Sequence, residues 1–460
     1  VSYLDTQFLF SLDYKMKKII LAMAAAALIA PAAKAFASEP AGETAKTEKP
    51  SHIKFYGFIR NYFAFDTRES KAGTKDLFYY LPKDEALNAK GEDMNAQSTF
   101  RFLAITSRFG LDIKDYQIGN TNVAAKIETD FYCMNGNVAV LRLRQAFATL
   151  SWKDLGKENS QSASLKIGQA WHPLAADQPY VIDLETGTPF NPFSRTPQVM
   201  FDYNFSKNFT LTGGIIYQMQ YLSAGPNGAS DNYLKYSCVP EIYAGATFKS
   251  NNGFTGRVGV DVLSIKPRWR DGAGNKVDDR ITTINPYVYA QYVNKDFSIN
   301  GKVVYASAGE HFNMLSGYGV SKVNADGSMD YAPLHSTASF LSVKYGRKVQ
   351  VQGMIGYVKN LGTSESLVAD KTVDGKDYTK TSNLYISGNG FHNLNQLFRV
   401  TPTVLYNLGK LSFGLEYDIT AAQYGKYEES GYVNASNGLV DGGLHWITNH
   451  RLLGMVKFTF

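Results

Sequence analysis

The chain has 460 residues, with 47 lysines and arginines against 41 aspartates and glutamates, and a mean hydropathy of −0.24. The low hydropathy excludes a bundle of membrane-spanning helices, since each needs about 20 consecutive apolar residues. It does not exclude a membrane β-barrel, in which lipid-facing residues alternate with polar lumenal ones.

The N-terminal segment predicts export from the cytoplasm. Met16, Lys17 and Lys18 precede an apolar run at 19–30, and the small residues of 33–37 offer cleavage sites. The run is too short to cross a bilayer core of about 30 Å as a helix. We therefore expect residues 1–37 to be upstream residues plus a signal peptide starting at Met16, 38–52 a periplasmic lead-in, and 53–460 one barrel domain.

Alternation of apolar and polar side chains dominates the remainder of the chain. In the stretch 410–421, Leu411, Phe413 and Leu415 alternate with Ser412 and Glu416, which gives a strand one apolar and one polar face. We expect sixteen strands of this kind, at 53–66, 98–114, 120–132, 138–153, 162–170, 195–206, 207–222, 234–249, 252–266, 281–294, 295–308, 336–347, 348–360, 395–407, 409–424 and 446–460. Most are longer than the usual five or six residues or so, as membrane crossing requires.

The connections between these strands alternate between long and short. We expect long links at 67–97, 133–137, 171–194, 223–233, 267–280, 309–335, 361–394 and 425–445. A soluble sandwich has no reason to gather its long loops at one end, whereas outer-membrane barrels do. The predicted fold is therefore all-β: a 16-stranded antiparallel transmembrane β-barrel with short periplasmic turns and long extracellular loops. The terminal Phe460, closing an alternating strand, is typical of the tag presented to the barrel assembly machinery.

The faces assigned to the lumen carry more cations than anions. The predicted inward cations are Arg60, Arg108, Lys126, Arg142, Arg144, Lys166, Arg257, Lys302, Lys344, Arg399, Arg451 and Lys457. The predicted inward anions are Asp112, Glu128, Asp130, Asp202, Glu241, Asp261, Glu416 and Asp418. Sixteen strands leave room for an aqueous channel, and rings of basic side chains favour anions in such a channel.

The third long loop and one arginine pair are the sharpest candidates for a functional site. The loop Trp171–Ser194 carries Asp177, Asp183 and Glu185, and we expect it to fold inward opposite the basic wall; a solvated surface lid is the alternative. Arg142 and Arg144 share one strand face, and they could equally form a structural ladder with acids of the neighbouring strand. The candidate selectivity residues are Arg60, Arg108, Arg142, Arg144, Lys166, Arg257, Arg399, Asp177, Asp183 and Glu185.

Four short motifs resemble the DcaP-like trimeric porins of the outer membrane. They are Lys54-Phe-Tyr-Gly-Phe-Ile-Arg60, Ser107-Arg-Phe-Gly110, Leu141-Arg-Leu-Arg-Gln-Ala-Phe147 and Lys166-Ile-Gly-Gln-Ala-Trp171. The resemblance implies a homotrimeric channel for small, often anionic, solutes, with lumenal arginines as the filter. We accordingly expect an outer-membrane porin that passes small hydrophilic solutes by passive diffusion, with a mild preference for anions. The coiled-coil extension that some members carry is not expected, because only the lead-in 38–52 precedes the barrel here.

Two other classes of protein are alternatives to the channel: a barrel hydrolase, and a surface adhesin or structural anchor. The seven histidines are outside any nucleophile-elbow, zinc-protease or redox context. The Asp-rich loop 271–279 lacks the spacing of a calcium-binding EF-hand. We expect no cofactor, no metal and no nucleic-acid partner, and two unpaired thiols at Cys133 and Cys238 rather than a disulfide.

Overall fold

The computed structural model describes residues 52–134, 137–156, 160–218, 222–386, 392–428, 430–440 and 442–460. The predicted start at Met16, the signal peptide and almost all of the lead-in lie outside these residues. Within the described part of the chain, no helix is both long and apolar enough to cross a membrane.

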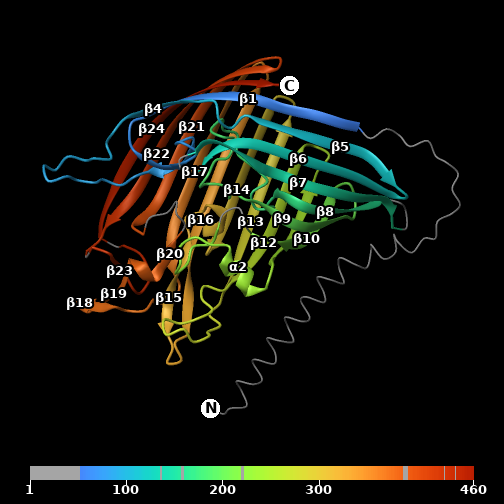
Figure 1. Cartoon of the computed structure of the whole chain (residues 1–460). Helices are drawn as coiled ribbons and strands as arrows, with labels where there is room; N and C mark the ends of the chain where they lie inside the picture. Colours follow the sequence, from blue (N-terminus) through green and yellow to red (C-terminus); the bar gives the residue numbers. More distant parts are fainter. Residues whose placement is uncertain are drawn as a thin grey trace, which may run out of the picture.

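Sixteen antiparallel strands close into a barrel (Figure 1). They are β1 (His52–Asp66), β5 (Arg108–Ile118), β6 (Thr121–Met134), β7 (Asn137–Leu155), β8 (Gln161–Trp171), β9 (Arg195–Asn204), β10 (Phe209–Ile216), β11 (Glu241–Lys249), β12 (Phe254–Ile265), β13 (Ile281–Asn294), β14 (Phe297–Ser307), β16 (Met329–Gly346), β17 (Val349–Thr363), β21 (Leu394–Leu408), β22 (Leu411–Lys426) and β24 (Gly442–Thr459). Each strand pairs with the next around the ring, and β24 pairs with β1 from Phe58↔Thr459 to Asp66↔Arg451. Closure leaves no free sheet edge, which is what a lipid environment demands of a β-structure.

The outer face of the barrel is apolar and exposed. Along β22, Phe413, Leu415 and Tyr417 are 42%, 55% and 38% exposed, whereas the intervening Glu416 and Asp418 are buried. Exposed apolar side chains in this number are stable in lipid rather than in water, and the polar set faces inward. The fold and this outer face are those of a protein of the bacterial outer membrane.

Several details of the predicted strand pattern are wrong. β10 ends at Ile216 rather than at 222, and β16 begins at Met329 rather than at 336. The second strand is interrupted at 104–107, so that β4 (Thr99–Leu103) and β5 pair with successive parts of β1. The predicted strand 234–249 begins only at Glu241, because Asn232–Ser237 form the helix α2. The link after β6, expected to be long, has two residues, since β6 ends at Met134 and β7 begins at Asn137.

The long connections carry their own small elements at one end of the barrel, away from the C-terminus (Figure 1). They are β2 (Ser70–Gly73), β3 (Phe78–Pro82), α2, η1 (Glu310–Phe312), β15 (Gly317–Val323), β18 (Lys371–Val373), β19 (Lys376–Lys380), η2 (Thr381–Asn383), β20 (Leu384–Ile386) and β23 (Tyr432–Asn434). β18, β19 and β23 form a separate three-stranded sheet, and β15 extends the wall beside β16 and β20.

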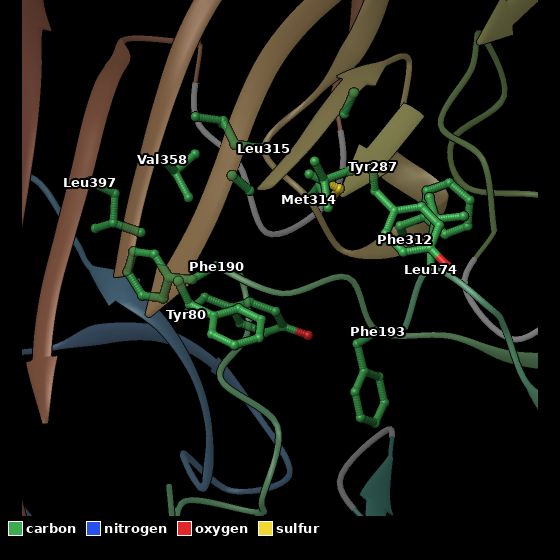
Figure 2. Close-up of a cluster of buried hydrophobic side chains, with 14 of the residues drawn as sticks. Tyr80, Leu174, Phe190, Phe193, Tyr287, Phe312, Met314, Leu315, Val358 and Leu397 are labelled. Atoms are coloured by element: carbon green, nitrogen blue, oxygen red, sulfur yellow. The ribbon is translucent and has the colours of Figure 1, made fainter. Parts of the chain in front are cut away.

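Three of these loops enter the barrel and pack together. Tyr80 of β3, Phe190 and Phe193 of the third loop, and Phe312 of η1 are buried in one hydrophobic cluster. Figure 2 shows this cluster meeting inward side chains of the wall such as Val358. The barrel interior is therefore partly filled by its own loops, and any aqueous path must run beside them.

Candidate functional site

The third loop, Trp171–Ser194, is bound to inward side chains on several strands. The Lys302 ammonium on β14 is buried and donates to the carbonyls of Leu174 (2.7 Å) and Asp177 (2.8 Å) and to Asn191 Oδ1 (2.7 Å). On the next wall strand, Ser342 Oγ accepts the Tyr180 N–H at 3.0 Å. A buried ammonium with three acceptors fixes the backbone it contacts, because removing it would leave those acceptors unpaired.

The acidic part of the same loop is held by a different part of the wall, on β22 and β24. Glu416 on β22 accepts the N–H groups of Ile182 and Asp183, at 2.8 and 3.1 Å. The Arg451 guanidinium on β24 lies 3.1 Å from the Asp183 carboxylate. Burial raises the pKa of Asp183 to about 6, although the positive charges of Arg451 and Arg399 act in the opposite direction.

A cavity of about 460 Å³ lies between the loops and the wall formed by β1 and β5 to β7. Its charged lining consists of Arg60, Arg108, Arg142, Arg144, Glu128, Asp130 and Glu185. This volume falls within the range of roughly 300–1,000 Å³ found for small-molecule sites. With four arginines and three carboxylates, the lining has one positive charge in excess.

Arg142 and Arg144 form the ladder of ion pairs with the neighbouring strand that was one of the two alternatives for them. They also line the cavity. Arg144 lies 2.8 Å from Glu128 and 2.7 Å from Asp130, and Arg142 lies 2.7 Å from Asp130. Two arginines therefore share two carboxylates on the facing strand β6. Pairing of this kind offsets most of their charge and leaves them as polar walls rather than as free binding groups.

Glu185 brings the loop to the arginine wall. Its carboxylate lies 3.4 Å from Arg60 NH1 and 2.9 Å from Lys457 Nζ. Burial works to raise the pKa of Glu185, but the charges of Arg60, Lys457 and Arg108 outweigh it and hold the pKa well below its usual range. Glu185 is therefore ionised at neutral pH.

Arg108 differs from the other three cavity arginines. Among the described residues it makes no ion pair and no side-chain hydrogen bond, and its guanidinium lies 4.9 Å from the ring centre of Phe58. Its charge is thus the excess charge of the lining. An uncompensated guanidinium with free donors is what would bind a passing carboxylate or phosphate.

The other five candidates lie elsewhere. Arg257 pairs with Asp177, and Arg399 donates to the carbonyls of Thr188 and Tyr80 at 3.2 and 2.7 Å. Beside Arg399 and Asp183 the free space is only about 10 Å³, enough for about one water molecule. Lys166 lies over the Phe147 ring, 5.4 Å from its centre, and does not line the cavity.

Sequence reasoning missed the anchoring role of the wall cations and the entry of the first loop. The carbonyls of Tyr79 and Tyr80 are held by Arg399, and the carbonyl of Asp76 by Arg451. Cys133, a free thiol, also lines the cavity. The apolar run Phe78–Leu81 could have predicted the entry of the first loop, because such a run is usually buried.

The Asp-rich loop 271–279 uses its carboxylates in contacts with neighbouring protein groups. Asp271 accepts the N–H groups of Ala273 and Asn275, and Asp279 lies 2.6 Å from Arg268.

A closed sixteen-stranded barrel with an apolar exterior, inward loops and a charged internal cavity defines the fold of the outer-membrane porins. The fold is similar to that of the outer-membrane channel DcaP of Acinetobacter baumannii, with a TM-score of 0.59 and 16% sequence identity over 92% of this chain and 100% of that chain. The predicted resemblance to DcaP-like porins is confirmed at the level of the fold.

Two further solved structures are less similar. An anion-selective porin from Comamonas acidovorans has a TM-score of 0.47 at 10% identity, covering 89% of this chain and 100% of its own. OmpF of Salmonella typhi has a TM-score of 0.45 at 12% identity, covering 89% and 97%. Neither likeness adds to the assignment. No family model matches the sequence, and no curated protein matches it.

Proposed function

We propose that this protein is a non-enzymatic channel through which small hydrophilic solutes, preferably anions, diffuse passively across the outer membrane. The observation that carries the proposal is the cavity of about 460 Å³ with one arginine, Arg108, whose charge no described carboxylate offsets by an ion pair. Excess positive charge in a confined aqueous space attracts anions and repels cations.

The loop Trp171–Ser194 forms the constriction in this proposal. Its contacts with Lys302, Glu416 and Arg451 hold it across the interior, and Glu185 at its tip faces Arg60. The solute path then runs through the cavity beside this contact, past Arg108, Arg142 and Arg144. The hydrophobic cluster of Tyr80, Phe190, Phe193 and Phe312 narrows the remaining space. Only small solutes are therefore expected to pass.

Assembly completes the proposal. The DcaP-like resemblance favours a homotrimer in the outer-membrane lipid. The terminal Phe460 ring stacks on Phe55 of β1, with ring centroids 5.5 Å apart. In this proposal the barrel assembly machinery recognises the strand that ends at Phe460. Native gel electrophoresis of the purified protein before and after heating tests the trimer; a single monomeric species before heating contradicts it.

Planar bilayers test the channel directly. We expect discrete conductance steps, and in a KCl gradient a reversal potential displaced toward the chloride equilibrium potential. Absence of conductance, or a displacement toward potassium, refutes the proposal.

Cys133 supplies a second test from within the cavity. In a Cys238→Ser background, which removes the exposed thiol, Cys133 should react faster with a sulfonate-bearing methanethiosulfonate than with its trimethylammonium analogue. Equal rates, after correction for the reagents' intrinsic reactivity, count against an anion-favouring cavity. Hydrolysis of a lipid or peptide by the purified barrel would favour the enzyme alternative.

A further inference from the structure

A cluster of basic and aromatic side chains lies on the exposed surface of the extracellular loops. It consists of Lys235 and Tyr236 of α2 and of Trp269, Arg270 and Lys276 in the loop that joins β12 to β13. The helix α2 lies at the loop end of the barrel (Figure 1). Trp269 is half-buried, and the other four side chains are exposed. We call these five residues the outer basic cluster; none of them lines the charged cavity.

Ring contacts hold the two segments of the outer basic cluster together. The rings of Tyr236 and Trp269 have centroids 4.5 Å apart. The Arg270 guanidinium lies over the Trp269 ring, 5.3 Å from its centre. The Lys235 ammonium lies over the Tyr236 ring, 5.5 Å from its centre. A cation that packs on a ring face keeps N–H donors available, so these contacts position the cations and leave their donors free for a ligand.

Two of the cations are opposite each other in a tight hairpin. Arg270 and Lys276 are paired as an isolated antiparallel bridge. The Asp271 N–H donates to the Asn275 carbonyl at 2.9 Å, which closes the turn between them. Side chains at opposite positions of such a pair lie on the same side, and like charges there repel each other. An anion bound between Arg270 and Lys276 would replace this repulsion by two attractions.

The carboxylates nearby do not offset the charge of the cluster. Its three cations form no ion pair in the part of the chain that the structure describes. The Asp271 carboxylate accepts the N–H groups of Ala273 and Asn275 in its own turn, at 3.0 and 2.7 Å. Asp278 lies 2.6 Å from Lys266, outside the cluster. With Asp271 counted against the three cations, two positive charges remain in excess.

We propose that Lys235, Arg270 and Lys276 bind a phosphate group, either on a phosphorylated saccharide or as free phosphate. A phosphomonoester carries about two negative charges at neutral pH, which matches the excess charge. The planar guanidinium can donate to two phosphate oxygens at once. Beside the phosphate, the rings of Tyr236 and Trp269 offer a sugar an apolar surface to pack against. Lipopolysaccharide, the phosphorylated glycolipid of the outer leaflet, and inorganic phosphate are the two sources of this group.

Binding of lipid-free ligands to the full-length protein in detergent is the first test. The probes for calorimetry at low salt are the phosphorylated core oligosaccharide of lipopolysaccharide, the same oligosaccharide after phosphatase treatment, and inorganic phosphate. We expect the phosphorylated oligosaccharide to bind about tenfold more tightly than the dephosphorylated one. Tighter binding than that of inorganic phosphate identifies lipopolysaccharide as the source, and equal binding identifies free phosphate. Equal binding of the two oligosaccharides, or no binding of any probe, overturns the proposal.

Two variants locate the site, and a third is the matched control. Arg270→Gln and Lys276→Gln should each weaken binding of the phosphorylated oligosaccharide by roughly tenfold, because each removes a charged donor. Neither side chain makes a hydrogen bond among the described residues, so both variants should fold. The control is Lys90→Gln, because Lys90 is also exposed and without a described ion pair, but lies in the loop between β1 and β5. Equal losses in all three variants would show diffuse attraction to the surface and overturn the assignment.

The Arg108→Gln variant separates this site from the proposed channel. Arg108 lines the cavity and is not part of the outer basic cluster, so its loss should leave oligosaccharide binding unchanged. Conversely, Arg270→Gln should bind the oligosaccharide weakly and keep the reversal potential of the unaltered protein. Binding lost with Arg108 but retained in the Arg270 variant would place the phosphate in the cavity and overturn the proposal.

Discussion

Replacing Arg108 by glutamine should remove most of the anion preference that we propose for the channel. The substitution leaves a polar side chain in the cavity and removes the one guanidinium of the four that has no ion pair among the described residues. No described hydrogen bond or ion pair is lost, only the contact of the guanidinium with the Phe58 ring. The folded barrel should therefore lose at most about 1 kcal/mol of stability. The expected effect is therefore on selectivity and not on assembly.

The magnitude follows from the size of the cavity. A sphere of 460 Å³ has a radius of about 5 Å, which sets the distance from a central ion to the wall. At a separation of about 5 Å in a water-like dielectric, the electrostatic interaction energy between two unit charges is about 0.8 kcal/mol. The effect is favourable for an anion and unfavourable for a cation, so the two differ by about 1.6 kcal/mol, or roughly tenfold in the permeability ratio. Salt screening reduces this value, since the Debye length at 0.1 M is about 10 Å.

The assay is the reversal potential in a KCl gradient at low total salt. Arg347→Gln is the matched control, because Arg347 is on a periplasmic turn with a side chain 76% exposed, paired with Asp296. We expect a shift toward zero or toward potassium for the Arg108 variant and no shift for the control. An unchanged potential in the Arg108 variant, or equal shifts in both, would refute the assignment of Arg108 to the filter.

Three further predictions concern the third loop. Lys302→Met should destabilise the folded barrel by about 2–3 kcal/mol in urea unfolding, because buried loop carbonyls lose their donor. The conductance of single channels should also increase, because the loop is held less firmly. Unaltered conductance would show that the loop does not limit the pore. Gly356→Ala places a Cβ 2.3 Å from the Phe190 ring, which displaces the loop and should also raise conductance. Gly213→Ala is the control, because its Cβ would have no atom nearer than 3.9 Å. Equal conductance of the two variants would refute the role of the Phe190 contact. Burial raises the pKa of Asp183 to about 6, above its unfolded value of about 3.9. The folded state then holds more protons between these values, so stability should fall as pH rises from 4 to 6 or so, and the Asp183→Asn variant should lack that part of the slope; identical pH profiles of the two proteins contradict the shift.

The strands could be predicted from the sequence where their inward side chains contact polar groups, because apolar and polar residues then alternate. In β22 the inward positions include Ser412, Glu416, Asp418 and Thr420, and the expected and observed strands nearly coincide. In β13 the burial alternates from Ile281 to Ala290, yet the sequence does not alternate, because inward Tyr287 and Tyr289 face packed loops rather than water. The polarity of an inward side chain matches that of the loop it contacts. The sequence of a single strand does not show which loop will pack against it.

The helix α2 and the break between β4 and β5 were missed for a related reason. Both follow local contacts made outside the strand's own pattern. The Arg60 N–H donates to Ser107 Oγ at 3.0 Å within the break, and Lys266 N–H donates to the Tyr233 carbonyl of α2 at 2.8 Å. Such pairings join residues far apart in sequence, so the apolar run 234–249 read alone predicts a strand.

Counting lumenal charges overstates how many of them a solute meets. Lys302 and Arg451 are buried against loop carbonyls and carboxylates, and Arg142 and Arg144 are paired with Glu128 and Asp130. Charges in such pairs exert little net field on an ion beyond them, because each cation is offset by a close acceptor. The surplus of cations predicted for the lumen therefore serves mainly to hold loops inside the barrel. Selectivity then depends on the few side chains that the loops leave unpaired, which is why one arginine should outweigh the rest.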